Sequence, residues 1–485
     1  MENSLPDYII IASYLLAIAL IGIFSGGRQK SVKDYFLGAK EIPWWIVCFS
    51  IIAAETSALT FISIPGLAYL TNLNFLQVAF GFLIGRIFVA IFFLPAYFKG
   101  ELETAYKYLD TRFGKTTRSF ASIVFLLTRL AADGVRLFAT SIPLYLMLQI
   151  NPIVAIIIVA IISLIYTYTG GIKGVIWVDA LQMFIYIGGA IAAGIILLNL
   201  LPGGWDTVLK SAATDSKLSF INTGFSLSFS EFISRPYTLF AGIIGGAFLS
   251  MASHGTDQLI VQRLLATKDL KEAKKAVIGS GIIIVFQFTF FLILGILLYA
   301  YYGNLNIRSD EIFPKFIIEV LPVGVSGIII AGLLAAAMST IAGSMSSLSS
   351  SAMMDIFIPF FGKNINENKK LIISRILTIF FALLLILFAL IFVESSQAVV
   401  EVALSIASFT YGGLLGAFLL GLIYQKVEEK EAIIGFITGI VIMIVIISLK
   451  LVAWTWFTFV GVIVTVLVGS MLTWIKNSKL KNKAN

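Results

Sequence analysis

Long uncharged apolar runs constrain this chain more than any other feature of its sequence. The first run, Tyr8 to Gly27, spans 20 residues without a charge, and about 20 apolar residues cross the core of a bilayer as a helix. Only 12% of the 485 residues are charged, whereas soluble domains carry roughly 25%. The runs show no strand-period alternation, which excludes a membrane β-barrel. The sequence therefore predicts an all-α polytopic membrane protein.

About thirteen apolar segments follow one another along the chain. They are expected at 7–27, 43–71, 74–99, 118–149, 151–169, 174–201, 236–264, 275–302, 323–360, 371–393, 396–425, 430–449 and 451–476. No linker or soluble-sized insert interrupts them, so we expect one membrane domain over residues 1–485. The first segment lacks a preceding basic stretch and a cleavage site, which favours a retained helix over a signal peptide.

The basic residues alternate between the two sides of the expected helices. With the N-terminus outside, the inner loops and tail hold 25 Lys and Arg, Arg263 among them, and the outer loops hold 6. The remaining three lie inside apolar segments and are Arg86, Arg129 and Arg136. The positive-inside rule then predicts a multi-pass protein of the plasma membrane, of the bacterial inner-membrane kind, with a cytoplasmic C-terminus. The net charge of +8 is explained by topology, and no nucleic-acid partner is expected.

Charged residues inside apolar segments mark candidate sites, because each costs about 2.5–3.5 kcal/mol on insertion scales. Glu55 lies in mid-segment with no base near it in sequence, which favours a functional role. Arg129, Asp133 and Arg136 share one helix face, and a buried structural ion-pair group explains them equally well. The remaining candidates are Asp179, His254 and Asp257. Arg86 could pair with any of these acids.

Two apolar segments contain polar interruptions at corresponding places, around 53–57 and 250–257. Paired interruptions of this kind indicate an inverted-repeat transporter with its site at the membrane midplane. Unwound carbonyls there suit a hard cation such as sodium, and the hydroxyls of Ser339 and Thr340 could complete its shell. Interhelical hydrogen bonding is the alternative explanation of this Ser/Thr-rich segment.

An ordered set of motifs resembles the sodium:solute symporter family of sugar, proline, pantothenate, iodide and sialic-acid carriers. The motifs are Asp34 to Gly38 before Trp44-Trp45, Glu55-Thr56-Ser57 with Pro65-Gly66, Tyr166 to Gly171 with Ile176 to Asp179 and Gln182, Val261-Gln262-Arg263, Ala335 to Thr340, and Gly412 to Gly416. They cover about residues 8–425 in the expected order. The resemblance implies a solute transporter and no enzyme.

The resemblance implies a LeuT-type fold with a five-plus-five inverted repeat. Its parts would be a leading helix at 7–27, a first repeat at 43–201, a second repeat at 236–425 and two trailing helices at 430–476. It also implies a sodium ion held by five residues. These are the carbonyls of Ala53, Thr56 and Ala336 and the hydroxyls of Ser339 and Thr340.

Some family members hold a second sodium with an aspartate that matches Asp179 and with further hydroxyls. Those further positions fall on Ala342 and Gly343 here, which carry no hydroxyl. We therefore expect one sodium per cycle as the coupling ion, and Asp179 remains a candidate second-sodium or proton site.

The resemblance also implies where the substrate binds. The candidate contacts are Glu55, Ser57, Thr60, Phe75, Asp133, Arg136, His254 and Asp257. Sialic-acid carriers use a glutamine and an arginine that match Ala79 and Ala132, so sialic acid is not expected. The resulting hypothesis is sodium-driven symport of a small polar organic solute (amino-acid-like, sugar or carboxylate) into the cell, with no protein partner indicated. The alternatives are proton coupling through Glu55, an integral-membrane enzyme that uses His254 and Asp257, and a channel.

Overall fold

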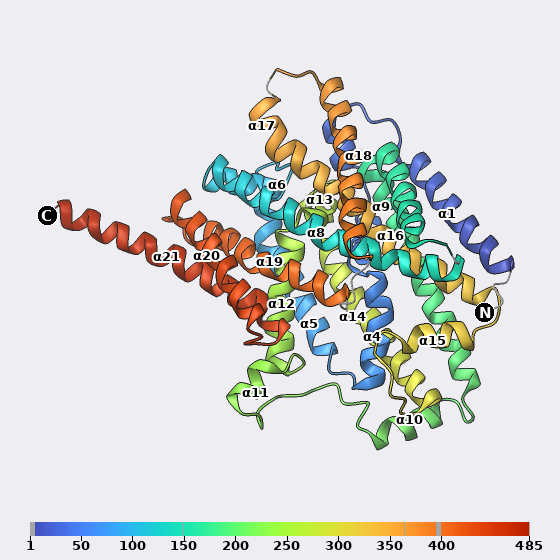
Figure 1. Ribbon diagram of the computed structural model, residues 1–485. Coiled ribbons are helices and arrows are strands. Elements are labelled where there is room, and N and C mark those ends of the chain that lie inside the picture. The colour runs from blue at the N-terminus through green and yellow to red at the C-terminus, as the bar shows by residue number, and fades with distance from the viewer. Residues whose placement is uncertain (1–4, 149, 363, 394–398, 485) are drawn as a thin grey trace.

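The computed structural model describes residues 5–148, 150–362, 364–393 and 399–484 (Figure 1). The secondary structure in these ranges is helical, apart from one isolated bridge between Ile42 and Thr267. The α-helices are α1 (Leu5–Gly26), α2 (Val32–Leu37), α3 (Trp44–Glu55), α4 (Ala58–Leu70), α5 (Leu76–Phe88), α6 (Leu94–Lys99), α7 (Lys107–Arg112), α8 (Lys115–Leu148), α9 (Pro152–Leu200), α10 (Trp205–Thr214), α11 (Phe229–Ser234), α12 (Leu239–Gly255), α13 (Gln258–Leu265), α14 (Leu270–Tyr302), α15 (Ile312–Glu319), α16 (Val325–Ser351), α17 (Ile358–Phe361), α18 (Glu367–Ile391), α19 (Val399–Ile423), α20 (Glu429–Ser448) and α21 (Phe457–Ala484). Four short segments, η1 (Gly38–Lys40), η2 (Val89–Phe93), η3 (Ala352–Phe357) and η4 (Trp454–Trp456), join or extend them. The predicted start of one segment, at 396–398, lies outside the described residues.

Both predicted helix interruptions are confirmed. The chain bends by 64° between α3 and α4, and a second break separates α12 from α13. Each new helix begins at a polar cap: the Ser57 side chain accepts from the Thr60 amide, and the Asp257 side chain accepts from the Leu259 amide. Such capping satisfies amide groups that the break leaves without helical partners. The two breaks therefore follow from the polar residues that interrupt these apolar segments.

The two helices predicted at 151–169 and 174–201 are both present, and they join across a kink with no loop between them. α9 runs through both segments, and Gly171 inside it takes φ 57° and ψ −160°. Only glycine adopts this region readily, and a Cβ at Gly171 would meet the Tyr35 carbonyl oxygen at 2.7 Å. A single glycine thus replaces the expected loop.

Among the described residues, nine helices are long and apolar enough to cross a membrane, and the bent pair of α3 and α4 makes a tenth. α8 is not among them, since it carries Arg129, Asp133 and Arg136 within its span. α19 is not among them either, because the part of it that could be assessed, Thr410–Ile423, is apolar but shorter than a full span. The count of thirteen spans therefore stays a prediction.

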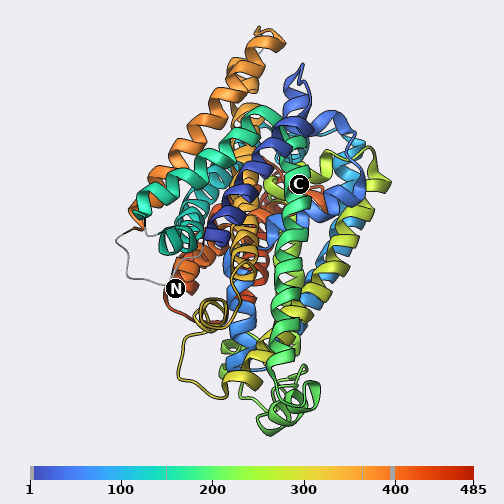
Figure 2. The same ribbon diagram turned by 90° about the vertical axis from the view of Figure 1, so that its right-hand side faces the viewer.

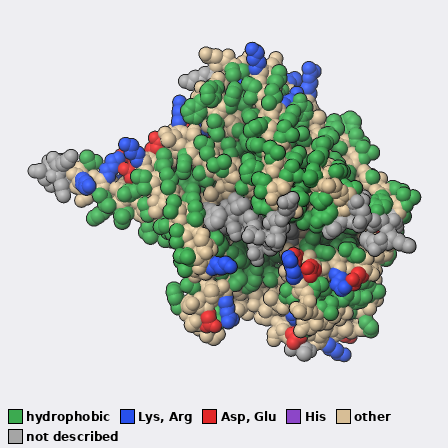
Figure 3. All heavy atoms as spheres, viewed as in Figure 1, with side chains coloured by type: hydrophobic (Ala, Val, Ile, Leu, Met, Phe, Trp, Pro, Cys, Tyr) green, Lys and Arg blue, Asp and Glu red, His purple; other side chains and the backbone are tan. Residues whose placement is uncertain are grey.

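The outer surface fits a lipid environment. Figure 3 shows hydrophobic side chains over most of one face, with charged groups toward its upper and lower parts, and many large apolar side chains are exposed. α10, α11 and α15, from the predicted outer loops, gather at the lower part of Figure 1, whereas α6 and α17 lie near the top. Figure 2 shows the long helices standing side by side between these two ends. α16 is buried along nearly its whole length among them.

Candidate functional site

The break between α3 and α4 lies against the middle of α16. α3 ends at Glu55, and the last carbonyls of a helix have no partner within it. The Thr340 hydroxyl lies 3.3 Å from the carbonyl oxygen of Ala54 and 3.5 Å from that of Ala336. Ala53, Ala336 and Thr340 are all buried. Carbonyl and hydroxyl oxygens from the two predicted elements thus converge at one buried place, which suits a sodium ion.

Side chains from two further helices hold the break in place. The Gln287 amide of α14 donates to the Thr56 hydroxyl (2.8 Å), and the Tyr186 hydroxyl of α9 donates to the Gln287 carbonyl oxygen (3.1 Å). The hydroxyls of Ser57 and Thr60 lie 3.2 Å apart. The main chain of the break is therefore held by side chains of α9 and α14.

Asp179 forms a buried ion pair with Arg263. Nη2 of Arg263 lies 2.9 Å from the carboxylate, and neither side chain is exposed to solvent. The hydroxyls of Ser50 and Ser339 also donate to this carboxylate, at 2.6 and 2.7 Å. The assignment of Arg263 to an inner loop is wrong, because α13 carries it into the protein interior. The predicted sodium ligand Ser339 lies between the Thr340 site and this pair.

The residues around Asp179 do not fit a second sodium ion. The matching positions, Ala342 and Gly343, supply no side-chain oxygen. The carboxylate already has a guanidinium partner in Arg263, and a second cation would be repelled by that charge at short range. We therefore derive no transport step through a second sodium.

Glu55 is paired with Arg86, which was one of several possible partners in the sequence. Arg86 is fully buried and donates to the Glu55 carboxylate and to the Ser280 hydroxyl (2.8 Å). His254 Nε2 lies 3.7 Å from the same carboxylate, while its Nδ1 lies 2.8 Å from the Ser253 hydroxyl. Among the described residues, this Nε2 has no hydrogen-bond partner. The charge of Glu55 is thus compensated within the protein by Arg86 of α5, and His254 of α12 lies beside the pair.

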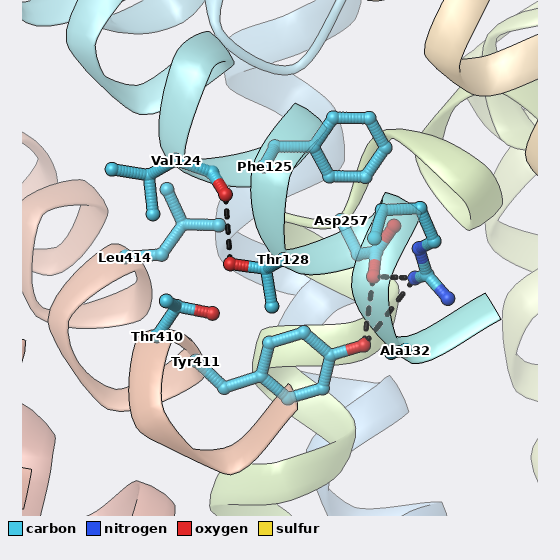
Figure 4. A pocket seen from close by; sticks show the side chains of 9 residues that line it. Val124, Phe125, Thr128, Ala132, Asp257, Thr410, Tyr411 and Leu414 are labelled. Atoms are coloured by element: carbon cyan, nitrogen blue, oxygen red, sulfur yellow. Dashed lines mark hydrogen bonds and ion pairs between the residues drawn. The ribbon is translucent and has the colours of Figure 1, made fainter. Parts of the chain in front are cut away.

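The charged residues of α8 connect the α12–α13 break to α19. Asp133 accepts from Arg136 (2.7 Å) and from Arg129 (3.4 Å), so the predicted ion-pair group is confirmed. Arg129 also donates to Asp257, at the α12–α13 break, and the Tyr411 hydroxyl donates to Asp257 at 2.7 Å. Figure 4 shows Tyr411 pointing toward Asp257. The α8 group and Asp257, which are far apart in sequence, therefore form one network.

Two cavities adjoin this network. One, of about 10 Å³, is drawn in Figure 4 and includes Arg129 and Asp257 in its wall. The other, also of about 10 Å³, is lined by Ser57, Ala58, Arg136, Ala139, Thr140, Ala337 and Thr340. Arg136 is the charged residue of this second lining, and 21% of its side chain is exposed. The second cavity thus joins a guanidinium to the α3–α4 break and to a predicted sodium ligand.

Phe75 lies outside these two linings. Its ring centroid is 5.1 Å from that of Phe288 and 5.8 Å from that of Tyr237, and only 8% of the residue is exposed. It therefore belongs to an aromatic cluster beside α14. Sequence reasoning missed several residues that hold the candidate site together, and these are Ser50, Tyr186, Ser280, Gln287, Ser344 and Tyr411. Little in the sequence singles these residues out, since each is an uncharged polar residue within an apolar segment.

Comparison with known proteins identifies the family. The model of the sodium:solute symporter family matches residues 35–439. The sodium/sialic acid symporter NanT of Aliivibrio fischeri is 30% identical over 96% of this chain and 92% of its own length. The human sodium-coupled monocarboxylate transporter 1 is 26% identical over 90% of this chain and 72% of its own length.

A solved structure extends this similarity to three dimensions. The substrate-bound outward-open state of a Na⁺-coupled sialic acid symporter matches with a TM-score of 0.89 and 27% identity over 98% of both chains. Mhp1, a nucleobase-cation-symport-1 family transporter, matches with a TM-score of 0.55 at 12% identity, which shows the fold alone. The predicted LeuT-type all-α fold is confirmed, and the relatives are transporters, so the enzyme alternative is set aside. This multi-pass membrane protein belongs to the sodium:solute symporter family and uses Na⁺ as its coupling ion.

Proposed function

We propose that this symporter moves a small organic carboxylate into the cell together with sodium. The placement of Arg136 carries the proposal. Its guanidinium donates from Nη1 to Asp133, and among the described residues its other N–H groups have no hydrogen-bond partner. A guanidinium edge that faces a small cavity suits a carboxylate, which it can bind through two parallel hydrogen bonds.

The surroundings of Arg136 favour a small substrate. The cavity beside Arg136 is small, with about 10 Å³ of free space, which is room for about one water molecule. Ser57 and Thr140 offer hydroxyls in the same lining. Ala79 and Ala132, where the resemblance places the glutamine and arginine of sialic-acid carriers, are buried methyl groups without donors. A carboxylate smaller than sialic acid therefore fits this lining better.

The relatives agree with a carboxylate and differ in its size. The names of these proteins include sialic acid and monocarboxylates, and both substrates carry a carboxylate. A glucose cotransporter is also similar, at 27% identity, so a neutral sugar is the competing substrate class. Glu55 and Arg136 are each paired with an opposite charge of the protein. Arg136 lines the cavity beside Ser57 and Thr340 and Glu55 does not, which favours a carboxylate over an ammonium there.

The coupling follows from differential binding. A sodium ion at the carbonyls of Ala53, Thr56 and Ala336 and the hydroxyls of Ser339 and Thr340 would join the α3–α4 break to α16. Thr340 also lines the substrate cavity, so that ion and substrate would stabilise the same closed arrangement. Rocking of one bundle against the other then opens the inner side. A sodium ion that moves inward through 100 mV releases about 2.3 kcal/mol.

Uptake by proteoliposomes tests the proposal. Labelled short-chain carboxylates, amino acids and neutral sugars are compared under an inward gradient of sodium or of potassium. We expect sodium-dependent uptake of a carboxylate, and an increase of its half-saturation concentration by about tenfold or more in Arg136→Gln, because a charged hydrogen bond is worth about 1.5–3 kcal/mol.

The matched control removes a similar charge elsewhere. Arg235→Gln alters an exposed arginine that precedes α12 and should leave uptake unchanged. Uptake of a neutral sugar alone, or carboxylate uptake that Arg136→Gln does not affect, would contradict the proposal.

A further inference from the structure

Thr56 is the residue at which the chain leaves the helical path of α3. Its amide still donates to the Ile52 carbonyl oxygen at 2.9 Å, whereas the residue itself takes φ −82° and ψ 93°. These angles are extended rather than helical, so the Thr56 carbonyl no longer points along α3. Because the rotamer of a β-branched side chain is coupled to its backbone angles, a bond that fixes the hydroxyl also helps to fix the carbonyl.

The side-chain amide of Gln287 fixes this hydroxyl from α14. Its Nε2 donates to the Thr56 hydroxyl at 2.8 Å, and its Oε1 accepts from the Tyr186 hydroxyl at 3.1 Å. The tyrosine thus occupies the amide oxygen and turns the amide nitrogen toward Thr56. All three side chains are buried, and a buried polar group that loses its partner is costly. The three groups therefore hold one another in a single arrangement.

The helices that carry Gln287 and Tyr186 pack directly against the two elements of the sodium site. A Cβ on Gly295 of α14 would overlap the Pro65 carbonyl oxygen of α4, so these two helices are in backbone contact. A Cβ on Gly332 of α16 would lie 3.0 Å from the Cα of Tyr186 on α9. The bond to Thr56 therefore comes from a support that packs on α4, which follows the break, and on α16.

We propose that Gln287 is a positioning residue of the sodium site, which sets the affinity for the ion by holding the Thr56 hydroxyl. The inference rests on the sodium site proposed at the α3–α4 break, and it adds a residue outside the five expected ligands. Without the amide, the Thr56 side chain could change rotamer, and its carbonyl would be held less firmly toward the ion. Sodium binding would then weaken although every ligand atom is still present.

A sodium titration of thermal stability in detergent, with potassium added to keep the ionic strength constant, tests this inference without the substrate. Gln287→Leu should raise the half-saturating sodium concentration by about two- to tenfold, the range that one neutral hydrogen bond covers. Thr56→Val removes the hydroxyl, keeps the carbonyl and should cause a similar rise, whereas Thr56→Ser should bind sodium as the wild type does. The double variant of Gln287→Leu and Thr56→Val should bind no more weakly than either single variant, because both changes break the same bond.

Gln77→Leu is the matched control, because Gln77 and Gln287 are each 3% exposed and the Gln77 amide bonds to main-chain groups near the start of α5. This control should lower the thermal midpoint in potassium and leave the half-saturating sodium concentration unchanged.

The outcomes separate the inference from the sodium site on which it rests. If Gln287→Leu lowers only the midpoint, as the control does, or if the two single effects multiply in the double variant, the inference is overturned and the sodium site remains. If sodium stabilises the wild type no more than potassium does, the proposed site is overturned and the inference with it. If Gln287→Leu does not fold in detergent, Thr56→Val and Thr56→Ser decide, since unchanged sodium affinity in Thr56→Val would also overturn the inference.

Discussion

Arg86 and Glu55 depend on each other because each is held inside an apolar bundle. Arg86 has no solvent exposure, and its Nη1 and Nη2 are fixed by Ser280 and Glu55. Removal of one partner of such a pair leaves the other charge uncompensated, which costs far more than the intact pair contributes. The pair also places a carboxylate one residue before the unwound Thr56. The ion pair between Glu55 and Arg86 therefore helps to fix the backbone at the α3–α4 break.

We expect Arg86→Met to lower the free energy of unfolding by about 3–5 kcal/mol, since it leaves Glu55 without its guanidinium. The double variant Glu55→Gln with Arg86→Met should recover a large part of that loss, because no charge is then left unpaired. Thermal unfolding in detergent measures both variants. Equal losses in the single and double variants would mean that packing, and not charge, dominates at this position.

At the scale of elements, two glycines of α9 differ sharply in what surrounds them. Gly171 has a positive φ of 57° and lies against the Tyr35 carbonyl. Gly188 has helical geometry, and no atom lies within 4 Å of a Cβ built there. The first glycine makes the turn that joins two spans, and the second is an ordinary helix residue. The same substitution should therefore have opposite effects at the two sites.

Gly171→Ala should lower the free energy of unfolding by at least about 1–3 kcal/mol, which is the cost of an unusual backbone region, with the clash against Tyr35 added to it. Gly188→Ala should be neutral or raise it by up to about 1 kcal/mol, since alanine favours helix over glycine. The thermal midpoints in detergent, measured side by side, provide the comparison. A loss at Gly188 equal to that at Gly171 would contradict the role given to the turn.

The helices and their breaks were largely predictable from the sequence, whereas the residue pairs that join different helices were not. The polar residues in apolar segments predicted the two breaks correctly, because a polar group inside a membrane is costly and marks a special position in the helix. The sequence predicted a gap at 170–173 between two helices, and the backbone freedom of Gly171 is sufficient to join them without a loop. The pairing of Asp179 with Arg263 crosses 84 positions, and no local pattern encodes such a contact. Buried pairs of this kind depend on the packing of whole helices.

At the scale of the whole molecule, a second ionic cluster lies at the end of the bundle that includes α7 and α17. Asp355 on η3 is fully buried and accepts from Arg118 (2.8 Å), Thr104 (2.5 Å) and Ser351 (3.1 Å). Arg118 also reaches Asp110 on α7 at 3.0 Å. η3 continues α16, the helix that carries Ser339 and Thr340. The cluster therefore ties this end of α16, through η3, to α7 and α8.

The bonds of Asp355 must weaken if this end opens during transport, so we expect Asp355→Asn to favour the open arrangement. Charge-assisted hydrogen bonds contribute about 1.5–3 kcal/mol, and a loss of about 1.4 kcal/mol shifts an equilibrium tenfold. The opening can be measured with a Thr128→Cys reporter in the cavity beside Arg129. The reporter is placed in a Cys48→Ala background, because Cys48 is the chain's single cysteine and would otherwise react as well. Maleimide should label this reporter up to about tenfold faster in Asp355→Asn. Asp310→Asn, at the opposite end, is the matched control, and equal rates in the two variants would show that Asp355 does not hold the end closed.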